Sequence, residues 1–126
     1  MKLYLLDAGG AGLVISFLII FMIVAVVIEA LMMMALKYNK AGKSFLDSLA
    51  INLVSLGLGF VMLTTDSLEI IENEILNYIL LFLITVLVEL LTLYLLNRSK
   101  PFSKTLLVSV VINIVSYGIL SLFTFL

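Results

Sequence analysis

Residues 10–36 read GAGLVISFLIIFMIVAVVIEALMMMAL, an apolar run that contains one charged residue, Glu29. The apolar residues are continuous rather than alternating, which favours a helix over a membrane β-strand. A helix needs about 20 predominantly apolar residues to cross a bilayer. The run is therefore long enough to form a transmembrane helix, with length to spare for tilt.

Three further apolar runs follow, at residues 45–63, 75–96 and 103–125. Over the whole chain of 126 residues, 64% are hydrophobic and 12% are charged. Soluble domains carry about 25% charged residues, so an ordinary soluble domain is excluded. We predict an all-α integral membrane protein with one transmembrane domain, 1–126, built from four transmembrane helices arranged as two tandem hairpins.

Local signals place the helix ends. Asn39 and Gly42 are typical of a helix C-terminus and are predicted to end the first helix. Ser44 followed by Asp47 predicts a capping box at the start of the second helix. Asp66 is predicted to begin the third helix.

The basic residues predict how the chain is oriented. Six of the seven lie in two loops, 37–44 and 97–104, namely Lys37, Lys40, Lys43, Arg98, Lys100 and Lys104. Because short cytoplasmic loops are enriched in Lys and Arg, both loops are predicted to be cytoplasmic. Both termini and the acidic middle loop then face outside. The small size and the lack of cysteine favour a bacterial inner membrane.

Composition also excludes several classes of function. The chain has no histidine and no cysteine, which removes the commonest general base and the thiolate metal ligands. No basic surface typical of a nucleic-acid-binding protein is present. We therefore expect no enzymatic activity, no metal, no cofactor and no nucleic-acid partner.

The two halves of the chain resemble each other. Glu29 and Glu89 are 60 positions apart. Six further identities recur 61 positions apart: Lys43, Ser48, Asn52, Val54, Ser55 and Gly57 match Lys104, Ser109, Asn113, Val115, Ser116 and Gly118. We predict a duplicated hairpin, with repeat one at about 10–64 and repeat two at about 67–126. Both copies start outside, so the repeat is parallel, with a pseudo-twofold axis along the membrane normal.

The repeat predicts a layer of polar side chains inside the membrane. Glu29 and Glu89 each lie seven residues from the cytoplasmic end of their helix, which is roughly 10 Å at 1.5 Å per residue. The predicted layer consists of Glu29, Asn52, Ser55, Glu89, Asn113 and Ser116. Within it, we expect each glutamate to pair with an asparagine, either Glu29 with Asn52 and Glu89 with Asn113 or the crossed arrangement.

Helical spacing predicts which faces turn inward. Ser48, Asn52, Ser55 and Gly59 follow spacings of four, three and four, so they share one helix face. Small and polar residues line helix contacts within membranes, so this face is expected to pack inside the bundle. The apolar faces are expected to meet the lipid bilayer.

Two functions compete for the polar layer. In the first, it holds the helices in register, and the protein is a non-catalytic accessory or self-associating subunit of a membrane complex. In the second, the protein is a small oligomeric transporter or channel in which Glu29 and Glu89 bind a proton or cation, because carboxyl groups within the membrane are often functional. An intramembrane enzyme is a third and weaker alternative, supported only by two carboxyls and several hydroxyls. A homo-oligomer or a larger complex is expected in the first two cases.

Overall fold

The computed structural model describes residues 8–125, which form four helices joined by short connections. These are α1 (Ala8–Ala35), α2 (Ala41–Thr64), α3 (Glu74–Leu96) and α4 (Phe102–Phe125). No strand occurs in that part of the chain. The predicted all-helical fold is therefore confirmed.

Each helix contains a segment long and apolar enough to cross a membrane. The four segments are Ile15–Ala35, Ala41–Thr64, Glu74–Leu96 and Phe102–Ile119. All four coincide with the apolar runs read from the sequence.

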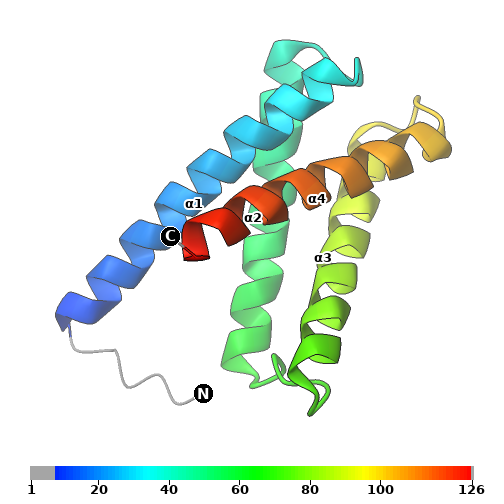
Figure 1. Cartoon of the computed structure of the whole chain (residues 1–126). Coiled ribbons are helices and arrows are strands. Elements are labelled where there is room, and N and C mark those ends of the chain that lie inside the picture. The colour runs from blue at the N-terminus through cyan, green and yellow to red at the C-terminus, as the bar shows by residue number, and fades with distance from the viewer. Residues whose placement is uncertain (1–7, 126) are drawn as a thin grey trace.

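The helices form a ring in which each packs against two neighbours. α1 and α3 both contact α2 and α4, while within residues 8–125 no contact joins α1 to α3 or α2 to α4. The turns 36–40 and 97–101 lie at one end, and segment 65–73 lies at the other, as Figure 1 shows. We call these the basic-loop end and the acidic-loop end, after the charges that they carry.

The start of α2 differs from the prediction. The helix begins at Ala41, so Gly42, Ser44 and Asp47 all lie inside it, and the predicted capping box is wrong. Gly42 therefore does not end the first helix. The N-cap position belongs to Lys40, whose side chain makes no capping hydrogen bond. Ser44 instead donates to the carbonyl oxygen of Asn39 at 3.1 Å.

The start of α3 also differs. Asn73 is the N-cap residue, and its side-chain oxygen accepts a hydrogen bond from the backbone N–H of Leu76 at 3.1 Å. Asp66 does not begin α3, because it closes the end of α2 in the left-handed region at φ 58°. Just after it, the Ser67 N–H donates to the carbonyl of Met62 at 2.8 Å, the pattern of a Schellman motif.

The end of α1 is closed in the same way. Lys37 adopts φ 54°, and the Tyr38 N–H donates to the carbonyl of Met33 at 2.9 Å. Glycine is usual at this position because it has no Cβ to clash in the left-handed region. The chain thus reverses sharply with a lysine at the strained position.

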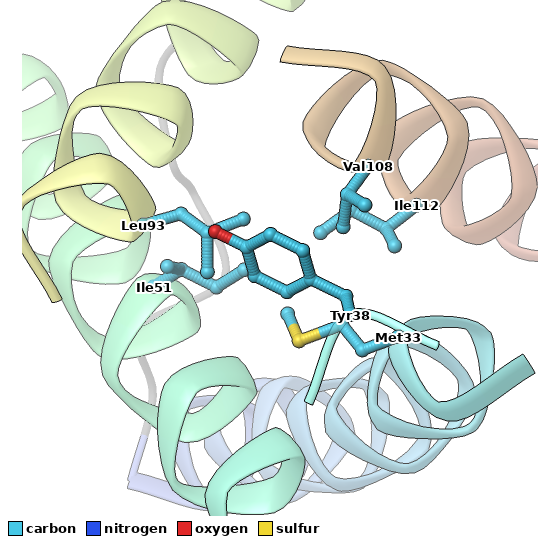
Figure 2. Close-up of a cluster of buried hydrophobic side chains, with 6 residues drawn as sticks. All are labelled: Met33, Tyr38, Ile51, Leu93, Val108 and Ile112. Carbon is cyan, nitrogen blue, oxygen red and sulfur yellow. The ribbon is translucent and has the colours of Figure 1, made fainter. Parts of the chain in front are cut away.

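The hydrophobic core lies near the basic-loop end. Figure 2 shows its six side chains, Met33, Tyr38, Ile51, Leu93, Val108 and Ile112, which come from all four helices and the first turn. The hydroxyl of Tyr38 is 2.8 Å from the hydroxyl of Thr105, to which it is hydrogen-bonded. Burial raises the pKa of the Tyr38 phenol, so it remains a neutral hydrogen-bonding group.

The half of the bundle next to the acidic-loop end is packed differently. Among the side chains that the structure describes in residues 12–24, 53–88 and 117–122, none is buried, and large apolar side chains are exposed on every helix. From their shared turn, α1 and α2 diverge toward this end (Figure 1). Between them lies an apolar cavity of about 430 Å³, lined among others by Leu18, Leu53 and Phe60.

Candidate functional site

Two buried glutamates form the centre of the candidate site. Glu29 of α1 is 2% exposed and Glu89 of α3 is 4% exposed. The two helices do not touch each other, but both carboxyl groups are hydrogen-bonded to α2. Their partners there, Asn52 and Ser55, are three residues apart, so they lie within one helical turn. The structure therefore places both glutamates within one layer inside the ring.

Glu29 accepts hydrogen bonds mainly from its own hairpin. Its Oε2 accepts from the hydroxyl of Ser48 at 3.1 Å and from the amide nitrogen of Asn52. The predicted pair of Glu29 with Asn52 is thus present. The hydroxyl of Ser116, from the other hairpin, donates instead to the carbonyl of Asn113 at 3.4 Å.

Glu89 has a different set of partners. Its Oε1 accepts from the hydroxyl of Ser55 at 2.7 Å, a contact that crosses from α3 to α2. The amide nitrogen of Asn113 donates instead to the carbonyl of Ser109 at 2.9 Å. The expected hydrogen-bonded pair of Glu89 with Asn113 is therefore not formed among the described residues, and Ser55 is the donor to this carboxyl group.

Two buried oxygens in this layer lack a donor. They are Oε2 of Glu89 and Oδ1 of Asn113. Both are acceptors when Glu89 is ionised, and a buried acceptor without a donor costs about 1–3 kcal/mol. A proton on Glu89 turns its Oε2 into a donor and removes one of these unpaired acceptors.

Several contacts of the layer recur at the offset of the sequence repeat. Asn52 and Asn113 each donate to the carbonyl of the serine one turn earlier, at 2.8 and 2.9 Å. That serine, Ser48 or Ser109, donates to a carbonyl of the preceding helix, Val26 or Val86, at 3.0 and 3.5 Å. Hydrogen bonds join four of the six predicted site residues into two pairs, Glu29 with Asn52 and Glu89 with Ser55. The other two, Asn113 and Ser116, are buried on α4 and bonded to each other.

Not every residue of the predicted inward faces joins the layer. Gly59 is exposed, and a Cβ added to it would meet no atom within 4 Å, so its predicted place inside the bundle is wrong. On α3, one turn either side of Glu89, the hydroxyls of Thr85 and Thr92 also stay out of the layer and donate to carbonyls of their own helix at 2.9 and 2.8 Å. The divergence of the helices beyond Ser55 explains why Gly59 faces outward.

A second polar cluster, at the basic-loop end, was not predicted from the sequence. Asp47 is buried, and its Oδ2 accepts from the amides of Asn39 at 2.7 Å and Asn97 at 2.8 Å. Lys43 pairs with the same carboxylate at 3.0 Å. This cluster joins the two turns and therefore the two hairpins. Its one sequence signal is the spacing of Lys43 and Asp47, four residues apart on a helix.

Two lysines strengthen the same junction. Lys43 donates to the carbonyl of Leu96 at the end of α3, and Lys104 donates to the carbonyl of Lys37 after α1, at 3.3 and 3.2 Å. Each lysine thus reaches from one hairpin to the C-terminal carbonyls of the other. Cations are favourable there because the helix C-terminus carries partial negative charge.

The polar layer offers carboxyl, amide and hydroxyl groups. These groups can donate and accept hydrogen bonds, and each carboxyl group can hold a proton. Within residues 8–125, no three His, Cys, Asp or Glu side chains are grouped as a metal site requires.

Comparison of the chain with protein-family models, curated proteins and solved structures finds no match. The function is therefore inferred from the chemistry and packing of this chain.

Proposed function

We propose that the protein is an integral membrane protein of two parallel hairpins, with the basic-loop end in the cytoplasm. The four long apolar helices support the membrane placement. The six loop cations at one end support the orientation. The recurrence of hydrogen bonds at offsets of 60 and 61 residues supports a duplicated hairpin with a pseudo-twofold axis.

Single-cysteine variants test the orientation. Because the chain has no cysteine, each added thiol is unique. A membrane-impermeant maleimide applied to intact bacterial cells should label Glu72→Cys, in the acidic loop. Ser99→Cys, in the second basic loop, should react only after the cells are opened. The reverse pattern would invert the proposed topology.

Within the membrane, the protein acts as a non-catalytic subunit that associates with itself or with a larger complex. The observation that carries this function is the unpacked half of the bundle. Its helices expose apolar side chains and leave an apolar cavity between α1 and α2. A helix from a second copy or from another subunit would complete this half by the close packing that drives helix association in lipid.

Cysteine cross-linking tests this association. Phe60 lines the cavity and is 66% exposed, while its neighbour Val61 is 54% exposed and does not line it. Under mild oxidation in native membranes, Phe60→Cys should form a disulfide-linked species and Val61→Cys should form much less. A monomer in mild detergent, with no cross-link and no co-purified partner, would contradict the proposal.

A second candidate function is proton or cation transport. The observation that favours it is the pair of buried oxygens without a donor, on Glu89 and Asn113. Proton and sodium fluxes into liposomes holding the purified protein should then fall in Glu29→Gln and Glu89→Gln. Glu72→Gln, a change in the exposed acidic loop, is the matched control. Unchanged flux in both variants would exclude this role for the two glutamates.

A hydrophobic carbodiimide separates the two functions, because it reacts with protonated carboxyls that it can reach within the membrane. For a structural subunit we expect no modification of Glu29 or Glu89 at any pH, since both are buried. A transporter must open this layer to solvent. Modification of either residue, falling as pH rises and the acid ionises, would therefore favour transport.

A further inference from the structure

A cavity of about 610 Å³ opens at the basic-loop end, beside the turn between α1 and α2. Four lysines line it: Lys37, Lys40, Lys43 and Lys100. One of them, Lys43, is neutralised by its ion pair with Asp47. Across the described part of the chain, no other carboxylate lies within 4 Å of a lysine of this cavity. Three of the lysines that line the cavity therefore have no carboxylate partner.

Part of the cavity lining is firmly placed. The lining includes Tyr38, whose buried ring belongs to the hydrophobic core. The ammonium nitrogen of Lys100 lies 4.9 Å from the centre of this ring, a cation–π contact that holds the charge at the cavity. The backbone of Lys37 is fixed by the sharp turn that closes α1. The cavity thus places positive charge around an open space.

The cavity lies at the end of the apolar segments, at the height in the bundle where lipid headgroups are expected. Met34, in the last turn of the apolar segment Ile15–Ala35, lines one side, and the lysines lie just beyond that segment. In the proposed membrane placement, this is where apolar acyl chains give way to phosphate groups. The exposed side chains of Leu31 and Leu46 offer apolar surface on the membrane side.

We propose that this cavity binds the phosphate group of an acidic phospholipid from the cytoplasmic leaflet. Three unpaired lysines would neutralise the lipid phosphate, as basic pockets at the cytoplasmic ends of membrane helices do. The bound headgroup would lie against both hairpins, because Lys100 belongs to the second turn and the other lysines belong to the first turn and α2. The identity of the anion as a lipid rests on the proposed membrane placement.

The test measures lipid binding to the full chain in a neutral detergent by native mass spectrometry. Phosphatidylglycerol is compared with phosphatidylcholine, whose headgroup has no net charge, and with soluble glycerol 3-phosphate. The wild-type chain should retain phosphatidylglycerol preferentially. Lys40→Gln should weaken this binding about fivefold, the effect of removing one lysine near a lipid surface.

Two further variants separate binding from folding. Lys37→Gly removes a charge from the cavity and also relieves a strained backbone position, so it should weaken lipid binding without lowering the melting temperature. Arg98→Gln removes the same charge from the same end of the bundle but does not line the cavity. It should leave the preference for phosphatidylglycerol within about twofold of wild type.

Three results would overturn the proposal. They are equal retention of the two lipids by the wild-type chain, equal weakening by Arg98→Gln and Lys40→Gln, and binding of glycerol 3-phosphate as tight as that of the lipid. Extraction of the chain from membranes by alkaline carbonate would instead refute the membrane placement. The failure of the lipid site and the failure of the membrane assignment are therefore distinguishable.

Discussion

The two ends of the bundle are built from the same kinds of helix but are packed in opposite ways. Near the basic-loop end, apolar, hydroxyl, amide and carboxyl groups are buried together between all four helices. Near the acidic-loop end, none of the described side chains is buried. The connections explain part of this difference. Two short turns hold the helices together at one end, and only segment 65–73 links them at the other.

The difference shows that apolar composition alone does not decide which part of the bundle packs, because all four helices carry long apolar segments. The helices meet where Glu29, Glu89 and Asp47 find donors, and α1 and α2 diverge beyond that region. Four pairs of substitutions test whether the two ends differ in this way.

The largest expected effect is on apolar packing. Leu93 is 0% exposed in the core, and Leu83 on the same helix is 55% exposed. Leu93→Ala should lower the free energy of unfolding by about 2–5 kcal/mol, because it leaves a cavity. Leu83→Ala should change it by less than about 0.5 kcal/mol. Reversible unfolding in mixed micelles measures both, and equal losses would show that the two halves are packed alike.

The next effect concerns the buried aspartate. In Asp47→Asn, one of the two acceptor oxygens becomes an NH2 group and the negative charge is lost. The NH2 group then faces either the amides of Asn39 and Asn97 or the ammonium group of Lys43. In both orientations a donor faces a donor, so we expect a loss of about 1–3 kcal/mol. Asp66→Asn is the control at the acidic-loop end, where asparagine suits the left-handed backbone. If the two variants unfold at the same denaturant concentration, the Asp47 cluster does not hold the hairpins together.

A smaller effect is expected from removing one hydroxyl. Tyr38→Phe loses the hydrogen bond to Thr105 and should cost about 1 kcal/mol. Tyr78, which is 75% exposed, lies at the start of α3 and provides the comparison. Tyr78→Phe should leave stability unchanged. The free energy of unfolding measures both variants. A loss in Tyr78→Phe as large as that in Tyr38→Phe would argue against a buried, ordered hydroxyl at the basic-loop end.

The smallest effect has the opposite sign and should be the same at both ends. Lys37 and Asp66 occupy equivalent left-handed positions, with φ of 54° and 58°. Replacing either by glycine should stabilise the protein by about 0.5–1 kcal/mol, since glycine avoids the Cβ clash. Thermal melts in detergent measure the gain. If Lys37→Gly destabilises the protein while Asp66→Gly does not, the Lys37 side chain stabilises the fold by more than its left-handed backbone destabilises it.

Sequence reasoning succeeded where the signal is local. The positions of the four helices and the inward placement of Glu29 and Glu89 follow from apolar runs and from the cost of a carboxyl group in lipid. The pairing of Glu29 with Asn52 also follows, because a short turn joins their helices. The starts of α2 and α3 were misplaced because Ser44 and Asp66 have residue types that suit several different positions near helix ends.

The amino-acid sequence is enough to establish that this chain makes four apolar helices and which of their residues are polar. The contacts between helices could be read only from the folded chain: Ser55 donates to Glu89, Asp47 joins Asn39 to Asn97, and one half of the bundle is left open. The apolar character of a helix depends on its own residues alone. Hydrogen bonds between helices depend instead on how close two helix axes are at the level of each polar side chain.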